Sequence, residues 1–89
     1  MYSYEIKPSL QKVLTKLSKK DKTTYEKVLK KIEEIINAQS IEHYKNLRYD
    51  LKDLKRVHVG RFVLLFGFEN STNTITFIDF DHHDNIYKK

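Results

Sequence analysis

Residues 54–80, LKRVHVGRFVLLFGFENSTNTITFIDF, decide the fold of this 89-residue chain. Leu54 to Val59 alternates between apolar and polar side chains, which is the period of a half-buried strand. A glycine and an arginine then separate it from Phe62 to Phe68, an almost wholly apolar run typical of an inner strand. Asn70–Asn73 has the composition of a turn and leads into the β-rich run Thr74–Phe80. The stretch therefore predicts a three-stranded antiparallel meander.

Upstream of this stretch the sequence predicts one more strand and two helices. Met1–Ile6 alternates tyrosine and isoleucine with polar residues, as a short strand does. From Pro8 to Leu17, apolar residues recur three and four positions apart, and a second such stripe occupies Tyr25–Ile36. The polar link between the stripes contains Asp21, a candidate N-cap. Because the link is short, we expect antiparallel neighbouring helices whose apolar stripes cover another element.

The prediction is a single domain over residues 1–89 of the α+β class, with an N-terminal strand, an antiparallel helical hairpin over one sheet face, and the meander. The length suits one domain. Residues 38–53 have a weak pattern and are read as a connecting turn or an extra helical turn. The absence of cysteine excludes disulfides, thiolate zinc sites and thiol nucleophiles. Without a signal-like segment or about 20 consecutive apolar residues, we expect a cytoplasmic protein with no membrane association.

The charge of the chain is unevenly distributed. Its formal net charge is +5, from 17 Lys and Arg against 12 Asp and Glu. Residues 45–61 hold six positive and two negative side chains. The lysines between residues 12 and 31 are spaced like the solvated faces of helices. Within this cluster we assign the functional charge to the segment Lys52–Arg61, which is expected to lie next to two histidines.

Three of the four histidines lie in or beside the meander. Alternation places Arg56 and His58 on one face of their strand, and His82 and His83 follow the last strand. A free histidine, with a pKa of about 6.5, suits proton transfer near neutrality, and a neighbouring arginine suits a phosphate. The pattern favours an acid–base site; the alternative for His58 is an ordinary solvent-facing strand residue.

A metal site competes with this interpretation, because Asp79, Asp81, His82, His83 and Asp84 are all ligand types within six positions. Adjacent strand residues point to opposite faces, so at most Asp79, Asp81 and His83 could converge. No separated partner such as a helical histidine pair is present. We predict no metal and no other cofactor, and expect the carboxylates to orient a histidine or to end the strand in solvent.

Two segments carry a resemblance to a known family. Residues 56–66, RVHVGRFVLLF, and 82–87, HHDNIY, resemble the RelE/ParE superfamily of toxins from bacterial and archaeal toxin–antitoxin systems. Its members typically read R-V-R-V-G-x-Y-R-V-x-Y in the middle and G-H-R-x-x-V-Y at the end. The resemblance covers the whole chain. It implies a RelE-like fold and a ribosome-dependent, metal-independent endoribonuclease that cleaves mRNA in the ribosomal A site. It also implies a cognate RelB-like antitoxin, bound in a complex such as a heterotetramer.

The resemblance assigns roles position by position. Arg56 and His58 fall at two basic catalytic positions, and Tyr87 matches the terminal tyrosine. His83 falls where many members have arginine. The two histidines are instead similar to the YafQ-like branch, which uses histidines for acid–base work but has aspartate near the place of Arg61. In the expected mechanism His83 is the general acid, His58 the general base, Arg56 the phosphate ligand and Tyr87 a stacking or hydrogen-bonding contact.

Four further side chains are expected to contact RNA. Alternation turns one of them, Lys55, to the helix-covered face, from which its stem would have to snorkel to the rim. Lys52, Lys55 and Arg61 are expected to contact the RNA backbone that flanks the cleaved bond. His82 is expected to stack on an RNA base.

Two other functions stay open. A ParE-like protein would bind a protein target such as DNA gyrase and would need no histidine pair. A non-catalytic basic module is favoured by Val63, which replaces an arginine of the family motif. If the chain is a toxin, an acidic amphipathic antitoxin segment would seat its apolar residues on the run Phe62–Phe68 or in grooves beside the helical hairpin.

Overall fold

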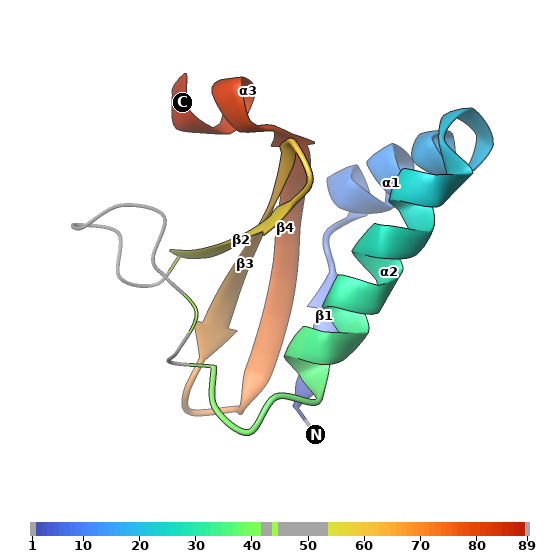
Figure 1. Cartoon of the computed structure of the whole chain (residues 1–89). Coiled ribbons are helices and arrows are strands. Elements are labelled where there is room, and N and C mark those ends of the chain that lie inside the picture. The colour runs from blue at the N-terminus through green and yellow to red at the C-terminus, as the bar shows by residue number, and fades with distance from the viewer. Residues whose placement is uncertain (1, 42–43, 45–53, 89) are drawn as a thin grey trace.

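The computed structural model describes residues 2–41, 44 and 54–88, with the backbone alone for residues 87 and 88. The predicted α+β architecture is confirmed, with a helical hairpin packed on a four-stranded sheet (Figure 1). Most of residues 38–53, predicted as a turn or an extra helical turn, lie outside the described residues. In chain order the elements are β1 (Ser3–Ile6), α1 (Pro8–Lys20), α2 (Lys22–Ile36), β2 (Leu54–Val59), β3 (Phe62–Glu69), β4 (Thr74–His82) and α3 (His83–Lys88).

The sheet has the strand order β1-β4-β3-β2. The predicted meander is confirmed, because β2 pairs antiparallel with β3 and β3 antiparallel with β4. Strand β1 pairs with β4 in parallel, as a strand connected through a helical crossover can. The pairing of β3 with β4 shifts between Leu65 and Phe66, where β4 holds one extra residue, Ile78. The shift is a β-bulge. The strand order makes β4 and β3 the two inner strands of the sheet.

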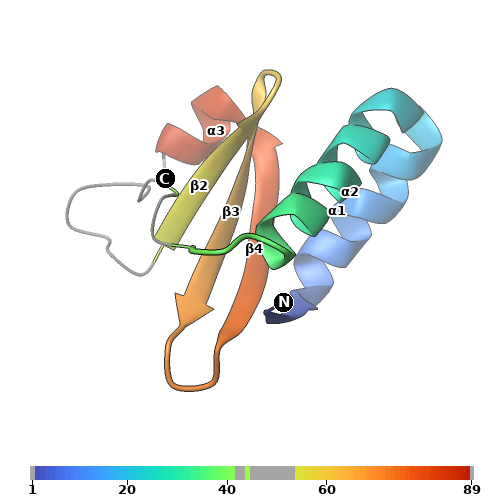
Figure 2. The same ribbon diagram turned by 60° about the horizontal axis from the view of Figure 1, so that its bottom comes forward.

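The helical hairpin covers one face of the sheet (Figures 1 and 2). Helix α1 extends to Lys20, beyond the apolar stripe that ends at Leu17. Its last residues can be polar because the side chains of Lys19 and Lys20 lie in solvent. Asp21 alone separates the helices and accepts a hydrogen bond from the Thr24 backbone N–H at 3.2 Å, so the predicted N-cap is confirmed. The core beneath the hairpin includes Leu10, Leu14, Val28, Ile32, Ile35, Leu64, Phe66, Ile75 and Phe77.

A second, smaller cluster lies on the other face of the sheet. Helix α3, which the sequence did not predict, begins directly after β4 and lies on the side of the sheet away from the hairpin (Figure 2). Its Ile86 is 1% exposed and packs with Val63, Leu65 and Ile78. Among the side chains of α3 that the structure describes, Ile86 is the apolar one that packs this six-residue helix on the sheet.

In the part of the chain that the structure describes, no helix has the length and hydropathy of a membrane span.

Candidate active site

The β2–β3 turn and the start of α3 form one end of the sheet. Gly60 has a φ of +63°, which glycine adopts without the steric cost that a side chain would bring. Next to it, the Arg61 carbonyl accepts a hydrogen bond from the His83 backbone N–H at 3.0 Å. This bond ties the first residue of α3 to the hairpin turn. An open groove of about 460 Å³ lies at the junction, lined by His58, Gly60, Arg61, His82, His83 and Asp84.

Two histidine rings face each other at this groove. The ring centroids of His58 and His83 are 5.7 Å apart, and their planes differ by 24°. The Arg56 Nη1 atom lies 3.4 Å from His58 Nε2. The fold therefore brings together three of the four residues predicted to be catalytic, although His83 lies far from the other two in the sequence.

The protein lowers the pKa of His58 below its ordinary value of 6.5. Partial desolvation of the imidazole is the largest cause, and the positive charges of Arg56 and His83 add to it. Each cause disfavours the protonated ring. The surroundings of His58 therefore favour its neutral ring, the form that can accept a proton.

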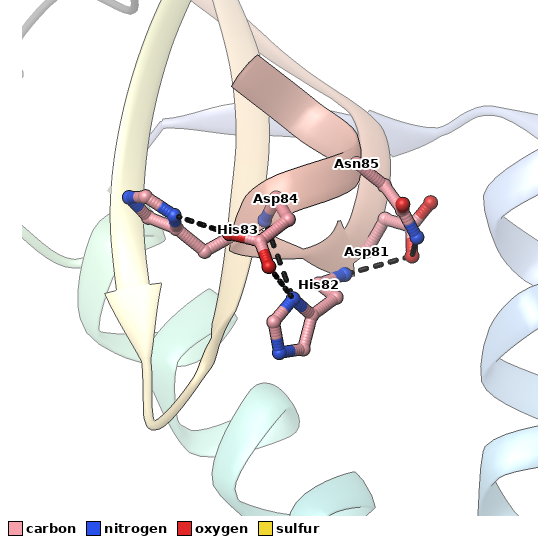
Figure 3. A network of polar contacts seen from close by, with 5 residues as sticks. All are labelled: Asp81, His82, His83, Asp84 and Asn85. Atoms are coloured by element: carbon pink, nitrogen blue, oxygen red, sulfur yellow. Dashed lines mark hydrogen bonds and ion pairs between the residues drawn. The ribbon is translucent and has the colours of Figure 1, made fainter. Parts of the chain in front are cut away.

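His82 and His83 point in different directions (Figure 3). The His83 side chain reaches toward β2, whereas the His82 ring lies edge-on to Phe62 at a centroid distance of 5.9 Å. His82 Nδ1 accepts a hydrogen bond from the Asp84 backbone N–H at 3.2 Å. His82 directly precedes α3, so this bond makes it the side-chain N-cap of that helix.

Asp84 lies between the two rings, with its Oδ1 3.5 Å from His83 Nδ1 and its Oδ2 3.8 Å from His82 Nδ1. Asp81, further back, accepts hydrogen bonds from the His82 backbone N–H and from the Asn85 side chain, at 2.7 and 3.1 Å (Figure 3). The sequence predicts only a general orienting role for these carboxylates. It did not single out Asp84, because the short α3 that places it carries too few residues to show helical periodicity.

The residues predicted to contact RNA are spread over the structure. Arg61 is exposed at the turn and lines the groove. The Lys55 ammonium donates to the Tyr44 carbonyl at 3.3 Å, on the helix-covered face, as alternation predicted. Lys52 lies outside the described residues. Tyr87 belongs to α3, but its side chain lies outside the described part of the structure.

Two sequence inferences change with the geometry. Strand alternation set Asp79, Asp81 and His83 as the largest set of ligand types that could converge, but β4 ends at His82 and His83 starts a helix, so alternation does not apply to His83. The centre of the run Phe62–Phe68 cannot offer its side chains to a partner, because Val63 to Phe66 are buried under the hairpin on one face and α3 on the other, while Phe62 and Phe68 at its ends are half-buried.

The burial of Val63 also explains the departure from the family motif. Val63 is fully buried and lies in the cluster that holds Ile86. An arginine at this position would have to displace α3 or bury its charge, which is costly without a partner. The valine therefore suits the packing of α3 against the sheet.

Comparison with known proteins agrees with this architecture. The family model for the ParE toxin of type II toxin–antitoxin system, parDE, matches residues 4–87. A relative from Methanocaldococcus jannaschii, named "Putative toxin RelE4", is 57% identical over 90 residues, which cover 100% of this chain and 94% of that protein.

Solved structures show the same fold at low sequence identity. YafQ from Escherichia coli strain BL21(DE3) superposes with a TM-score of 0.73 at 15% identity, covering 98% of this chain and 99% of its own. The archaeal RelE–RelB complex from Pyrococcus horikoshii OT3 gives a TM-score of 0.69 at 19% identity, covering 91% of this chain and 93% of the matched one. With the family match over nearly the whole chain, these likenesses identify the protein as a member of the RelE/ParE superfamily, the toxins of type II toxin–antitoxin systems.

Proposed function

We propose that this protein is an endoribonuclease that cleaves messenger RNA in the A site of the ribosome, in the cytoplasm, and that a RelB-like antitoxin holds it inactive. The observation that carries the proposal is the pair of histidine rings, 5.7 Å apart, beside the Arg56 guanidinium. Cleavage of RNA by side chains alone needs a base for the 2′-hydroxyl, an acid for the leaving 5′-oxygen and a cation for the phosphoryl oxygens. These three residues are of the types that the reaction needs.

The protonation states expected of the pair fit the two roles. Two imidazolium rings this close would repel, which disfavours the pair with both rings protonated. The lowered pKa of His58 favours its neutral ring, which suits a base that takes the proton of the 2′-hydroxyl. We assign His83 the complementary role of the acid that protonates the 5′-oxygen. Attack of the 2′-oxygen on phosphorus with loss of the 5′-oxygen leaves a 2′,3′-cyclic phosphate.

The remaining contacts of the proposed site are with the RNA itself. Arg56 neutralises the charge that builds on the phosphoryl oxygens, and Arg61 at the turn contacts the flanking backbone. Tyr87, four residues beyond His83 in α3, is proposed to stack on or hydrogen-bond the substrate. The roles of Lys52, Lys55 and His82 in RNA binding stay predictions, and the N-cap bond of His82 gives that residue a structural role as well.

The test is cleavage of ribosome-bound messenger by the purified protein. A positioned acid or base contributes about 10²- to 10⁴-fold, so His58→Ala and His83→Ala should each lower the cleavage rate at least 100-fold. Lys20→Ala, which removes an exposed positive charge at the end of α1, is the matched control and should cleave at the parent rate. Parent-rate cleavage by His83→Ala would contradict the proposal. A growth arrest accompanied by gyrase-linked DNA damage rather than cut messenger would favour the ParE-like function.

The proposed binding site of the antitoxin is a groove of about 430 Å³ between β1 and α2. Tyr4 and Leu29, which line it, are 52% and 40% exposed, and both are large hydrophobic residues. The net charge of +5 favours an acidic partner, and an amphipathic segment would cover the two side chains. The archaeal RelE–RelB complex of the same fold supports the choice of a RelB-like protein as this partner.

The groove and the histidines can be tested separately. Leu29→Asp places a charge in the groove and should weaken antitoxin binding at least tenfold, while ribosome-bound messenger is still cleaved at the parent rate. The control is Lys16→Ala, on the exposed face of α1, which should change neither. Antitoxin binding unchanged by Leu29→Asp would show that the partner sits elsewhere.

A further inference from the structure

The carboxylate of Asp84 reaches the ring of His83, while its backbone N–H reaches the ring of His82 (Figure 3). The first contact joins Asp84 Oδ1 to His83 Nδ1 at 3.5 Å. The second is a bond of 3.2 Å from the Asp84 amide to His82 Nδ1. Asp84 Oδ2 also lies 3.8 Å from His82 Nδ1, but the amide bond is the shorter contact and satisfies the geometry of a hydrogen bond to that nitrogen. The nearest Asp84 group is thus a donor at His82 Nδ1 and an acceptor at His83 Nδ1.

This difference sets which nitrogen of each neutral ring carries the proton. His82 Nδ1 accepts a hydrogen bond, so the neutral His82 ring must carry its proton on Nε2. His83 Nδ1 faces a carboxylate, which only accepts, so the neutral His83 ring carries its proton on Nδ1 and its lone pair on Nε2. The adjacent histidines are thereby held in opposite tautomers.

Two further contacts of His83 help to hold it in place. Its backbone N–H donates to the Arg61 carbonyl at 3.0 Å, which fixes the main chain, and its ring stacks beside that of His58. Neither contact distinguishes Nδ1 from Nε2 when the ring turns over. The carboxylate does distinguish them, because it attracts an N–H and repels a lone pair.

We propose that Asp84 is a positioning residue, whose carboxylate holds His83 in the Nδ1–H tautomer and so makes Nε2 the atom that exchanges a proton with the substrate. The catalytic consequence rests on the proposed function, whereas the tautomer is a property of the protein alone. The Asp84 side chain is 71% exposed, so water competes for the contact. A charged hydrogen bond weakened in this way should correspond to roughly a fivefold change in rate.

The test reads the tautomers directly, from long-range ¹H–¹⁵N correlation spectra of the labelled full chain at alkaline pH. In the parent protein we expect His83 as the Nδ1–H form and His82 as the Nε2–H form. Asp84→Ala should return His83 to the Nε2–H form that free histidine prefers in water. His82 should stay unchanged, since alanine keeps the backbone N–H. Asp84→Glu keeps a carboxylate that only accepts hydrogen bonds and should retain the Nδ1–H form of His83.

Two results would overturn the proposal: an Nε2–H tautomer of His83 in the parent protein, or the same His83 tautomer in the parent and in Asp84→Ala. An unchanged His82 signal shows that Asp84→Ala is still folded at the start of α3. In the cleavage assay, Asp84→Ala should lower kcat roughly fivefold with KM unchanged, and Asp84→Glu should restore most of it. If the tautomers behave as expected but no variant, nor the parent, cleaves messenger, the proposed function fails while the assignment of Asp84 stands.

Discussion

Ile86→Ala should release α3 from the sheet and leave the rest of the domain folded. Ile86 is 1% exposed, and the substitution removes three carbons at about 0.8 kcal/mol each, or about 2.4 kcal/mol. A six-residue helix is far shorter than the roughly 12–15 residues that a helix needs to persist alone in water. Docking of α3 therefore depends on this side chain, and its loss should appear as local rather than global opening.

The assay is native-state hydrogen exchange of the His83 amide, which bonds to the Arg61 carbonyl. A loss of about 2.4 kcal/mol corresponds to about 60-fold less protection. Ile86→Val removes a single carbon and should cost only about 0.8 kcal/mol, or roughly fourfold. Amides of β3 should keep their protection in both variants, and Leu29→Ala, at an exposed position, should leave the His83 amide unchanged. If the β3 amides lose as much protection as the His83 amide, α3 opens only with the whole domain, and local opening of α3 is refuted.

Three further outcomes follow from the backbone and the charges. Gly60→Ala should lower the unfolding free energy, measured in denaturant, by about 1 kcal/mol. The cost comes from the backbone, because a φ of +63° strains a residue with a side chain even though no atom lies within 4 Å of the added carbon. Gly60→Asn should cost less, since asparagine adopts this conformation more readily. Asp21→Ala should lower Tm by roughly 4–8 °C through loss of the cap on Thr24, and Asp21→Asn should recover most of it. The pKa of His58 is lower in the folded protein than in the unfolded chain, so the unfolded chain binds a proton more readily. The contribution of His58 to stability is therefore highest above pH 6.5 and falls as the pH drops through the folded pKa. His58→Gln should flatten this part of a plot of Tm against pH.

The sequence predicted the sheet well because its signals are local and strong. Alternation over Leu54–Val59 and the apolar run from Phe62 match β2 and β3 closely. The same alternation correctly turned Arg56 and His58 to one face and Lys55 to the other, where its ammonium contacts the Tyr44 carbonyl. Hydrophobic periodicity is set by which face of an element is buried, so long regular elements reveal it.

The end of β4 could not be predicted in the same way. Residues 83–88 turn into a helix, although a run of six residues with one buried isoleucine shows no periodicity. The helix is instead fixed by contacts distant in sequence, namely Ile86 on Val63 and the His83 amide on the Arg61 carbonyl. The difference matters for the site, because an extended chain would have placed neighbouring histidines on opposite faces by alternation alone, without bringing Asp84 between them.

The strand order places the groove proposed for the antitoxin and the histidine pair near opposite edges of the sheet. In the order β1-β4-β3-β2, His58 lies on one edge strand and Tyr4 on the other. A partner that fills only the groove between β1 and α2 would therefore leave the histidine pair uncovered. An antitoxin bound there can block messenger cleavage only if a further segment of it crosses to β2 or if its bulk keeps the toxin out of the ribosome. Since Leu29 and His83 belong to different faces, single substitutions can separate binding from cleavage, which would be impossible if one surface served both.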